Sequence, residues 1–347
     1  MRTLIGVALL VATAGATAQD SPWTYYGDLR LRAEKTADIP ARSDDIERLR
    51  SFLRAGARYN NENGFEFAAA GKLGVGSDDN ADNIRNLDNE RSDSGGIDEL
   101  YVAWAASEST RFQLGKGRNP FVTTPLTWDR DLRPIGAYVE YQTSVRDFDA
   151  FYFTGGYFAG DHLYSDDSKI AGLQIGYGWM EGAESGFSTF LGYFDYSDLD
   201  RAARSGLGRT NRRVNNRFVS DFDLLNWQLI GRLQLAEKPL VTRLDLVRNL
   251  GADDLRDGAR FSAIWGDAEG LGGWEVGYSY QRPQRDAVLA YFAEDDWWFH
   301  SFARGYMPWV AYGFERGISV QLSGFVERRD LLDDTTKRLL LDVRKRW

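Results

Sequence analysis

Apolar and polar residues alternate with a period of two along most of this 347-residue chain. In residues 24–35, for example, Leu29 and Leu31 alternate with Arg30 and Arg32. Such alternation is typical of a β-strand with one apolar and one polar face. After the first residues, no apolar run approaches the roughly 20 residues that a transmembrane helix needs. The pattern therefore predicts an all-β chain.

The alternation predicts sixteen strands, at residues 24–35, 48–59, 65–76, 97–105, 110–117, 135–143, 147–157, 168–179, 187–196, 222–235, 239–249, 258–266, 273–282, 304–314, 318–327 and 338–347. Most contain about 9–11 residues, the length that a tilted strand needs to cross a bilayer. A closed sheet satisfies every backbone hydrogen-bonding group in lipid. We therefore expect a transmembrane antiparallel β-barrel. In the seventh strand the alternation is interrupted at residues 151–153, which are all aromatic. In the fourteenth strand Pro308 is unusual, because proline is rare inside a sheet.

The expected connections alternate between short and long. The short ones lie at residues 60–64, 106–110, 143–147, 180–186, 236–238, 267–272 and 315–317. The longest lie at residues 77–96, 117–134, 197–221 and 283–303, and they are mostly polar. Short periplasmic turns and long extracellular loops are typical of outer-membrane barrels. An even strand count places both termini on the periplasmic side, where the short connections also fall.

The two faces of the expected strands fit a lipid environment. A cationic side chain at the bilayer midplane costs roughly 2–4 kcal/mol on the lipid face. At the alternating positions that would face lipid, charged residues occur near strand ends, at Lys116, Asp195, Arg248 and Lys345. Indoles favour the membrane interface, and five fall at expected periplasmic ends: Trp104, Trp179, Trp265, Trp274 and Trp347. A soluble β-sandwich or propeller would also alternate, but it would not explain the loop lengths.

The N-terminal residues predict a secretory signal peptide. Arg2 precedes an apolar run at residues 4–16, and Ala16-Thr17-Ala18 forms a cleavage signal. Residues 1–18 would be removed, and residues 19–347 would form the barrel. The absence of cysteine excludes a disulfide framework and thiolate metal sites. The formal net charge of −9 argues against a nucleic-acid partner.

Two neighbouring segments carry a resemblance to a known family. Residues 114–121 read LGKGRNPF, and residues 128–134 read WDRDLRP. Together with YGDLRLR at residues 26–32 and the arginine-rich residues 48–58, they resemble the bacterial "putative porin" family and, more distantly, the phosphate-selective porins. The resemblance implies a sixteen-stranded outer-membrane channel, monomeric or trimeric, for passive diffusion of small hydrophilic solutes or ions. Outer-membrane barrels usually end in Phe, whereas this chain ends in Trp347.

Inward-facing arginines form the first candidate site. The predicted pore-lining residues are Arg30, Arg32, Arg50, Arg54, Arg58, Arg344 and Arg346, the last two because the sixteenth strand should pair with the first. Arginine stays charged and can line an anion path. In the alternative interpretation, these side chains pair with acids on neighbouring strands, namely Asp28, Glu34, Glu66 and Asp342. Because inward acids nearly match inward bases over all strands, we expect only a mild anion preference.

Residues 117–134, the third expected extracellular connection when the one between the first two strands is counted, form the second candidate site. The resemblance implies that it folds into the lumen as a constriction loop that carries Asp129, Arg130, Asp131 and Arg133. Carboxylates facing the arginines would create a transverse field across the narrowest water. The alternative is a solvated external loop.

We predict no catalytic, metal or cofactor site. The only histidines, His162 and His300, are expected to be solvated, and Ser165 near His162 does not supply a triad. The glycines at positions 172, 176 and 178 are interpreted as small pore-facing residues. The acidic segment 77–96 lacks the spacing of a calcium loop. The basic segment 197–216 suits either contact with anionic lipid headgroups or attraction of anionic solutes to the mouth of the channel. Outer-membrane lipid and lipopolysaccharide are the expected surroundings. The alternative function is an outer-membrane enzyme or adhesin that uses the barrel as a platform.

Overall fold

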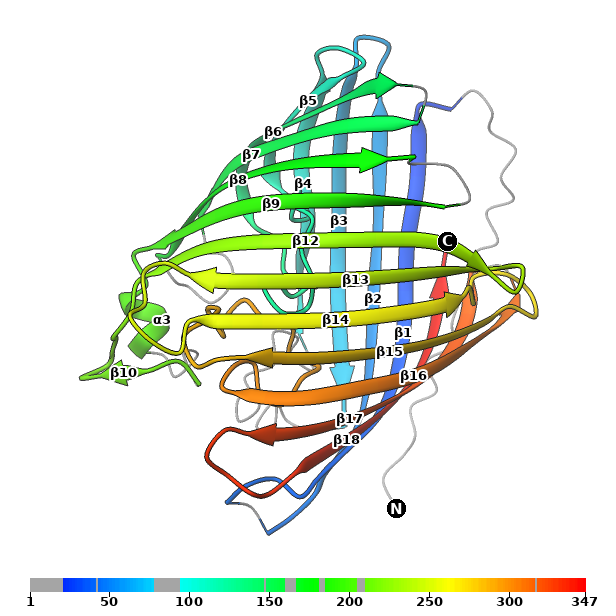
Figure 1. Cartoon of the computed structure of the whole chain (residues 1–347). Helices are drawn as coiled ribbons and strands as arrows, with labels where there is room; N and C mark the ends of the chain where they lie inside the picture. Colours follow the sequence, from blue (N-terminus) through cyan, green and yellow to red (C-terminus); the bar gives the residue numbers. More distant parts are fainter. Residues whose placement is uncertain are drawn as a thin grey trace.

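The computed structural model describes residues 21–41, 43–77, 94–146, 148–159, 167–180, 185–204, 210–315 and 317–347. Sixteen antiparallel strands close into one barrel, in which the first strand pairs with both the second and the last (Figure 1). A short helix and a two-stranded ribbon lie at one end of the barrel. Among the described residues, no helix has the length and apolar character needed to cross a membrane.

The strands follow the expected positions to within three residues at each end. The first half of the barrel consists of β1 (Trp23–Ala37), β2 (Ile46–Asn60), β3 (Phe65–Gly76), β4 (Ser94–Ala105), β5 (Thr110–Lys116), β6 (Ile135–Arg146), β7 (Asp149–Ala159) and β8 (Lys169–Trp179). The second half consists of β9 (Gly186–Ser197), β12 (Phe222–Leu235), β13 (Lys238–Asn249), β14 (Asp257–Gly266), β15 (Trp274–Pro283), β16 (Ala303–Glu315), β17 (Ile318–Arg329) and β18 (Thr336–Arg346). The helix is α3 (Asp200–Arg204), and the ribbon pairs β10 (Arg213–Val214) with β11 (Arg217–Phe218).

Two strands that looked irregular in the sequence belong to the barrel. β7 pairs continuously with β8 from Ala150 to Ala159 despite its run of aromatic residues. Pro308 lies inside β16, where it is paired with Tyr278 of β15, while the ladder to β17 omits this position. A proline has no N–H to donate, so the ladder on that side loses a hydrogen bond.

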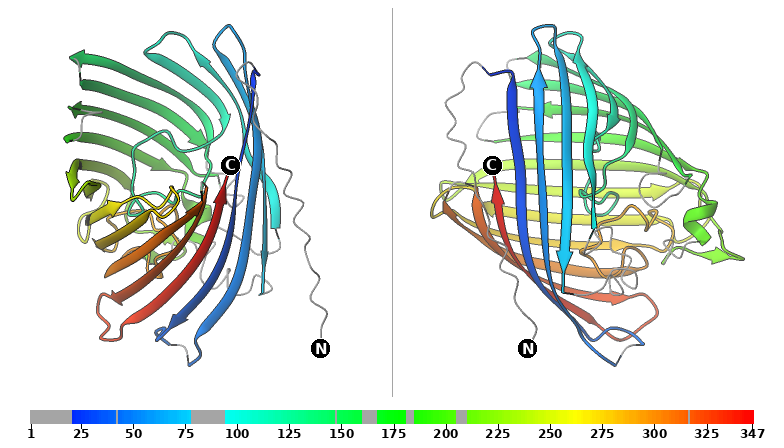
Figure 2. Two further views of the ribbon diagram at one scale, coloured as in Figure 1. Left: turned by 90° about the vertical axis from the view of Figure 1, so that its right-hand side faces the viewer. Right: turned by 180° about the vertical axis from the view of Figure 1, so that it is seen from behind.

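The connections confirm the predicted division between the two ends of the barrel. The strand ends that the longer connections β5–β6 and β15–β16 join lie at one end, and tight turns such as β2–β3 and β12–β13 lie at the other (Figures 1 and 2). In an outer-membrane barrel the end with the tight turns is periplasmic. We call it the periplasmic end and the opposite one the extracellular end.

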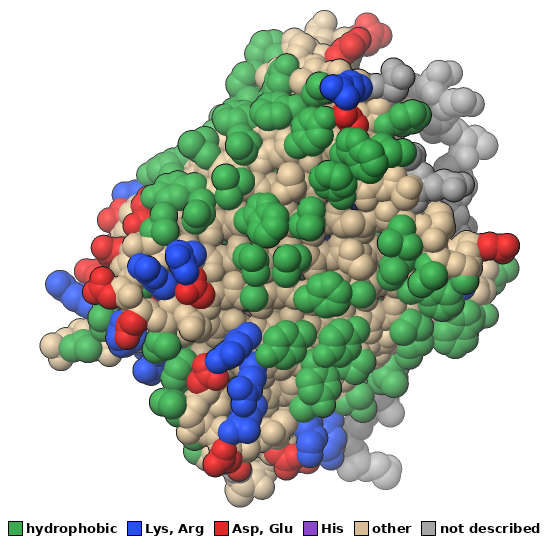
Figure 3. All heavy atoms as spheres, viewed as in Figure 1, with side chains coloured by type: hydrophobic (Ala, Val, Ile, Leu, Met, Phe, Trp, Pro, Cys, Tyr) green, Lys and Arg blue, Asp and Glu red, His purple; other side chains and the backbone are tan. Residues whose placement is uncertain are grey.

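The face of the barrel seen in Figure 3 carries many apolar side chains, with charged side chains mainly towards its margins. Leu31, Leu53 and Leu73 on adjacent strands point outward and are exposed. The five tryptophans expected at the periplasmic end lie at the ends of β4, β8 and β14, at the start of β15, and directly after β18. This arrangement fits an aromatic girdle at the membrane interface, as predicted.

The lumen differs from the sequence expectation in one respect. Residues 283–303 were expected to form a long, mostly polar external connection, but residues 286–297 are all buried. The run Ala287–Ala293 is almost entirely apolar, and burial inside the barrel removes this surface from water. Residues 117–134 also lie inside, since Leu126 and Asp129 are fully buried. We call residues 117–134 the first inward loop and residues 284–302 the second inward loop.

Candidate functional site: the basic side of the lumen

The arginines expected to line the pore come together on β1, β2 and β18, and we call this group of seven the arginine wall. β1 pairs with β18 so that Arg30 lies opposite Arg344 and Asp28 opposite Arg346. β1 also pairs with β2, which places Arg32 opposite Arg50. Since inward positions of neighbouring strands share one register, the arginines form a continuous surface from the extracellular to the periplasmic end.

At the extracellular end, this wall is neutralised by acids of its own strands. The carboxylate of Glu34 accepts hydrogen bonds from Arg50 at 3.0 Å and from Arg338 at 3.2 Å, and it also pairs with Arg48. Arg32 donates to Asp342 at 2.7 Å. These contacts match the cross-strand pairing that the sequence left open as the alternative. They are buried, so this part of the wall is a rigid ionic network and not a water-exposed surface.

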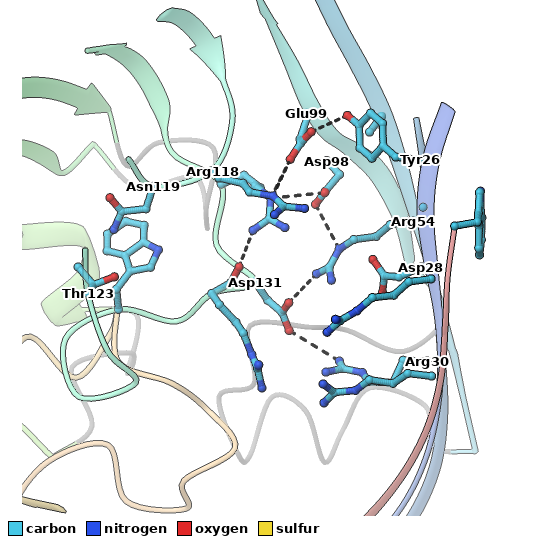
Figure 4. Close-up of a pocket in the computed structure, with 18 residues that line it drawn as sticks. Tyr26, Asp28, Arg30, Arg54, Asp98, Glu99, Arg118, Asn119, Thr123 and Asp131 are labelled. Carbon is cyan, nitrogen blue, oxygen red and sulfur yellow. Dashed lines mark hydrogen bonds and ion pairs between the residues drawn. The ribbon is translucent and has the colours of Figure 1, made fainter. Parts of the chain in front are cut away.

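In the middle of the barrel, the wall meets the first inward loop. Arg54 donates a hydrogen bond to Asp131 at 2.8 Å and lies 3.6 Å from Asp98. Asp131 also lies 3.7 Å from Arg30 (Figure 4). The loop is therefore fastened to the wall by a carboxylate that bridges two arginines.

At the periplasmic end, the remaining arginines have looser contacts. Arg58 lies over the ring of Tyr26, at 4.3 Å from its centroid, and 3.8 Å from Glu99. Arg344 donates to Asp342 at 3.1 Å. Arg346 pairs with Glu269 at 2.9 Å and remains more than half exposed. Glu66, expected as a partner of the wall, instead accepts a hydrogen bond from Arg111 at 2.9 Å.

A cavity of about 570 Å³ opens beside the wall, and we call it the basic cavity (Figure 4). Its charged lining consists of seven arginines, Arg30, Arg54, Arg118, Arg130, Arg133, Arg344 and Arg346, and four acids, Asp28, Asp98, Glu99 and Asp131. This lining has a formal charge of +3. Trp347 and the start of β1 also line the cavity, so it lies towards the periplasmic end.

A second cavity of about 570 Å³ lies on the other side of the first inward loop. Asn119 and Thr123 line the basic cavity, whereas Pro120 and Val122 line the second one. The loop therefore separates two water-accessible spaces. The charged lining of the second cavity is Arg111, Arg232 and Arg243 with Glu108 and Glu140, which leaves only +1.

Glutamine side chains hold the first inward loop against the wall opposite the arginines. The N–H of Val122 donates to Gln174 at 2.8 Å, and the carbonyl of Val122 accepts from Gln174 at 2.9 Å and Gln228 at 2.8 Å. The ring of Phe121 packs over Gly172, where a Cβ would lie 2.5 Å from the ring. Gly172 faces inward as expected, and the absence of its side chain leaves room for the loop.

The two inward loops pack against each other. Trp128 stacks on Phe292 with ring centroids 5.2 Å apart and an interplanar angle of 9°. The N–H of Asp129 donates to the carbonyl of Phe292 at 2.6 Å, and the N–H of Glu294 donates to the carbonyl of Pro125 at 3.1 Å. The second inward loop was not anticipated as part of a site, although its apolar run is a signal for burial.

Two carboxyl groups of the second inward loop, those of Glu294 and Asp296, have pKa values shifted in opposite directions. Burial raises the pKa of Glu294 to about 8, and the carboxylates of Asp296 and Asp295 add to the rise, whereas Arg130 opposes it. Burial alone would also raise the pKa of Asp296, but the guanidinium of Arg32 lowers it well below its usual range. Asp296 is thus an ionised partner of the arginine wall, and it ties this loop to β1.

The histidines do not assemble a catalytic site among the described residues. The prediction that His300 is solvated was wrong, because it is buried in the second inward loop and its Nδ1 lies 2.8 Å from the carbonyl oxygen of Ala290. His162 and Ser165 lie outside the described residues, as do residues 78–93 of the acidic segment. In the basic segment, Arg212 pairs with Asp254 at 2.6 Å, and Arg209 lies outside the described part.

A closed sixteen-stranded barrel with an apolar belt outside and charged cavities inside defines the class of protein, an outer-membrane channel. The family described as "Putative porin" matches residues 14–221, and the chain belongs to this family. Its function is therefore the passive diffusion of solutes across the outer membrane. Among curated proteins, no sequence matches the chain.

Several solved outer-membrane proteins have a similar fold. OprB of Pseudomonas putida, solved at high pH, is 11% identical with a TM-score of 0.66, and the match covers 94% of each chain. OmpF of Salmonella typhi, in complex with daunomycin, is 12% identical with a TM-score of 0.59, and the match covers 94% of this chain and 97% of that one. The trimer form of OmpT from Vibrio cholerae is 14% identical with a TM-score of 0.55, and the match covers 94% and 99%.

Proposed function

We propose that the channel passes small hydrophilic solutes with a mild preference for anions. The observation that supports this preference is the formal charge of +3 on the lining of the basic cavity. Arginine remains charged at every physiological pH and offers several donors to an anion. The preference is mild because the buried arginines at the extracellular end are already paired with Glu34 and Asp342.

In this proposal the candidate residues have two roles. Arg30, Arg54, Arg58, Arg344 and Arg346 line the path of the solute, and Arg32 and Arg50 order the wall behind it. The first inward loop, with Asp129, Arg130, Asp131 and Arg133, narrows the lumen to the spaces on its two sides. The contacts of Asp131 with Arg54 and Arg30 support the second role, since they hold the loop at a fixed distance from the wall.

Three further parts of the proposal concern the whole protein. We propose that the barrel acts without an enzymatic activity, surrounded by lipid and lipopolysaccharide. We also propose that it is exported by a signal peptide at residues 1–18, which N-terminal sequencing of the membrane-inserted protein would test. A trimer is proposed because an outer-membrane protein of similar fold, OmpT of Vibrio cholerae, has a trimer form. Light scattering of the detergent-solubilised protein would give its mass.

The anion preference is tested by reversal potentials in planar bilayers under a KCl gradient. Arg118→Gln and Arg344→Gln each remove one charge from the basic cavity. A charge about 4 Å away in water contributes about 1 kcal/mol, so each change should lower the anion-to-cation permeability ratio by at most about fivefold. Arg248→Gln is the matched control, because it removes the same charge from an exposed pair with Asp257 that does not line either cavity. Equal ratios in all four proteins would refute the preference.

A further inference from the structure

Three carboxylates from different parts of the chain meet inside the barrel. Asp129 belongs to the first inward loop, and Glu294 and Asp295 belong to the second. Each offers one oxygen, and these oxygens all lie within 4.8 Å of one another. All three residues are more than nine-tenths buried. Gathering three acids in this way is costly unless a positive charge compensates them.

The backbone fixes these carboxylates in place. The N–H of Asp129 donates to the carbonyl of Phe292, and the N–H of Glu294 donates to the carbonyl of Pro125. On the opposite side, the carbonyl oxygens of Asp295 and Asp296 each accept a hydrogen bond from Arg338 at 3.0 Å. The cluster is therefore preorganised by contacts between the loops and the barrel, and does not depend on the side chains finding one another.

Glu294 has an ion-pair partner but no hydrogen-bond donor at one of its carboxylate oxygens. Its Oε2 atom is buried and accepts no hydrogen bond. The nearest guanidinium, that of Arg130, lies 3.7 Å from this oxygen, and its side chain is 60% exposed. The guanidinium of Arg32 forms ion pairs with Asp296 and Asp342. One buried carboxylate oxygen thus remains available to a ligand.

We propose that Asp129, Glu294 and Asp295 bind one Ca²⁺ ion that joins the two inward loops. Ca²⁺ takes oxygen ligands at about 2.3–2.6 Å, so ligand oxygens on opposite sides of the ion lie about 4.6–5.2 Å apart. The separation of up to 4.8 Å between the three oxygens fits this requirement. Water completes the coordination, since the neighbouring residues Trp128 and Arg130 line the basic cavity. The site does not depend on the proposed anion preference.

Binding is measured on the full-length folded chain in detergent, freed of lipopolysaccharide, whose own cation sites would mask the signal. Calorimetric titration with Ca²⁺ gives the stoichiometry. Titration with Tb³⁺ gives a local signal, because Trp128 precedes Asp129 and can sensitise terbium luminescence. Folding of each variant is checked by its heat-modifiable migration on a gel.

Two conservative variants address the two loops separately. In Asp129→Asn, the amide oxygen can still accept the hydrogen bond that Asp129 receives from the N–H of Asp131 at 2.7 Å. In Glu294→Gln, the side-chain shape is kept while the charge is lost. Glu140→Gln is the matched control, because Glu140 faces the second cavity.

The proposal expects one Ca²⁺ per chain in the unmodified protein and in Glu140→Gln. Each cluster variant should bind at least tenfold more weakly and lose the Trp-sensitised terbium signal. If one variant does not fold, the other decides, since the two changes lie on different loops. Absence of stoichiometric binding to the unmodified chain, or equal binding by a folded cluster variant, would overturn the proposal.

Discussion

Asp131 accepts a hydrogen bond from Arg54 at 2.8 Å, which connects the first inward loop to the arginine wall. The same carboxylate lies 3.7 Å from Arg30, so one acid contacts two arginines that line the basic cavity. The contact has two consequences. It orders the loop, and it offsets part of the positive charge that a permeating solute would meet.

Replacing Asp131 separates these two consequences. Asp131→Asn should raise the anion-to-cation permeability ratio and increase current fluctuations, because it removes a negative charge and loosens the loop. Asp28→Asn removes the same charge from the same cavity and leaves Asp131, the residue that joins the loop to Arg54, unchanged. It should change the reversal potential in the same direction but leave the fluctuations as they are. Single-channel recordings of the two variants check both expectations, and identical noise in both would show that Asp131 does not order the loop.

The stacking of Trp128 on Phe292 should contribute to stability. Phe292 is fully buried between the inward loops. Phe292→Ala should therefore lower the free energy of unfolding by about 3–5 kcal/mol, the usual cost of deleting a buried aromatic ring. Leu331→Ala, at an almost fully exposed site, should change it by less than about 0.5 kcal/mol. Urea titration of the protein in lipid vesicles measures both. A small effect of the Phe292 change would mean that the loops are held by their polar contacts alone.

The lipid-facing surface gives a test of the barrel's position in the membrane. Leu53 points outward near the middle of β2, and Leu49 points outward close to its extracellular end. Leu53→Arg should cost roughly 2–4 kcal/mol of folding free energy, whereas Leu49→Arg should cost about 0–1 kcal/mol. Folding equilibria in vesicles provide the comparison. Equal costs at the two positions would contradict the placement of the apolar belt.

The pair between Asp296 and Arg32 predicts a dependence of stability on pH. Arg32 lowers the folded-state pKa of Asp296 below the ordinary value of 3.8. The contribution of this group is therefore complete above about pH 4, and it declines as the pH falls from 3.8 towards the lowered value. Breaking such a buried pair costs about 3 kcal/mol. Asp296→Asn should be less stable by about this amount between pH 5 and 8, a range set by the ordinary value near 4.

Thermal unfolding of the unmodified protein and of Asp296→Asn across this range measures the difference between them. The gap should narrow only in strongly acidic solution. Asp333→Asn, at a fully exposed loop site, is the control and should give no such gap. A gap that closed between pH 5 and 7 would show that Asp296 is not the ionised partner of Arg32.

The strands and their orientation could be predicted from the sequence because each depends on local alternation. Arg30 and Arg32 occupy alternating positions of β1 that face the lumen. Pairing of β1 with β18 then brings Arg344 to the same surface. Both possible environments of the arginines could also be predicted from the sequence. The structure contains each of them, paired towards the extracellular end and lining a cavity towards the periplasmic end.

The internal packing could not be predicted in the same way, because it depends on contacts between distant parts of the chain. The second inward loop was expected to be part of a mostly polar external connection, and it does contain Glu294, Asp295 and Asp296. Its apolar run at residues 287–293 was the opposing signal. The burial of His300 and the meeting of Asp129 with Glu294 follow from this packing, and no sequence spacing encodes either of them.

The most direct test of the account is the conductance of the purified, folded protein in a planar bilayer under a KCl gradient. We expect stepwise, ohmic openings and a reversal potential whose sign corresponds to a mild preference for chloride. The absence of steps from correctly folded protein would contradict a passive channel. Open steps with a cation-selective reversal potential would leave the channel in place and contradict the role proposed for the arginine wall.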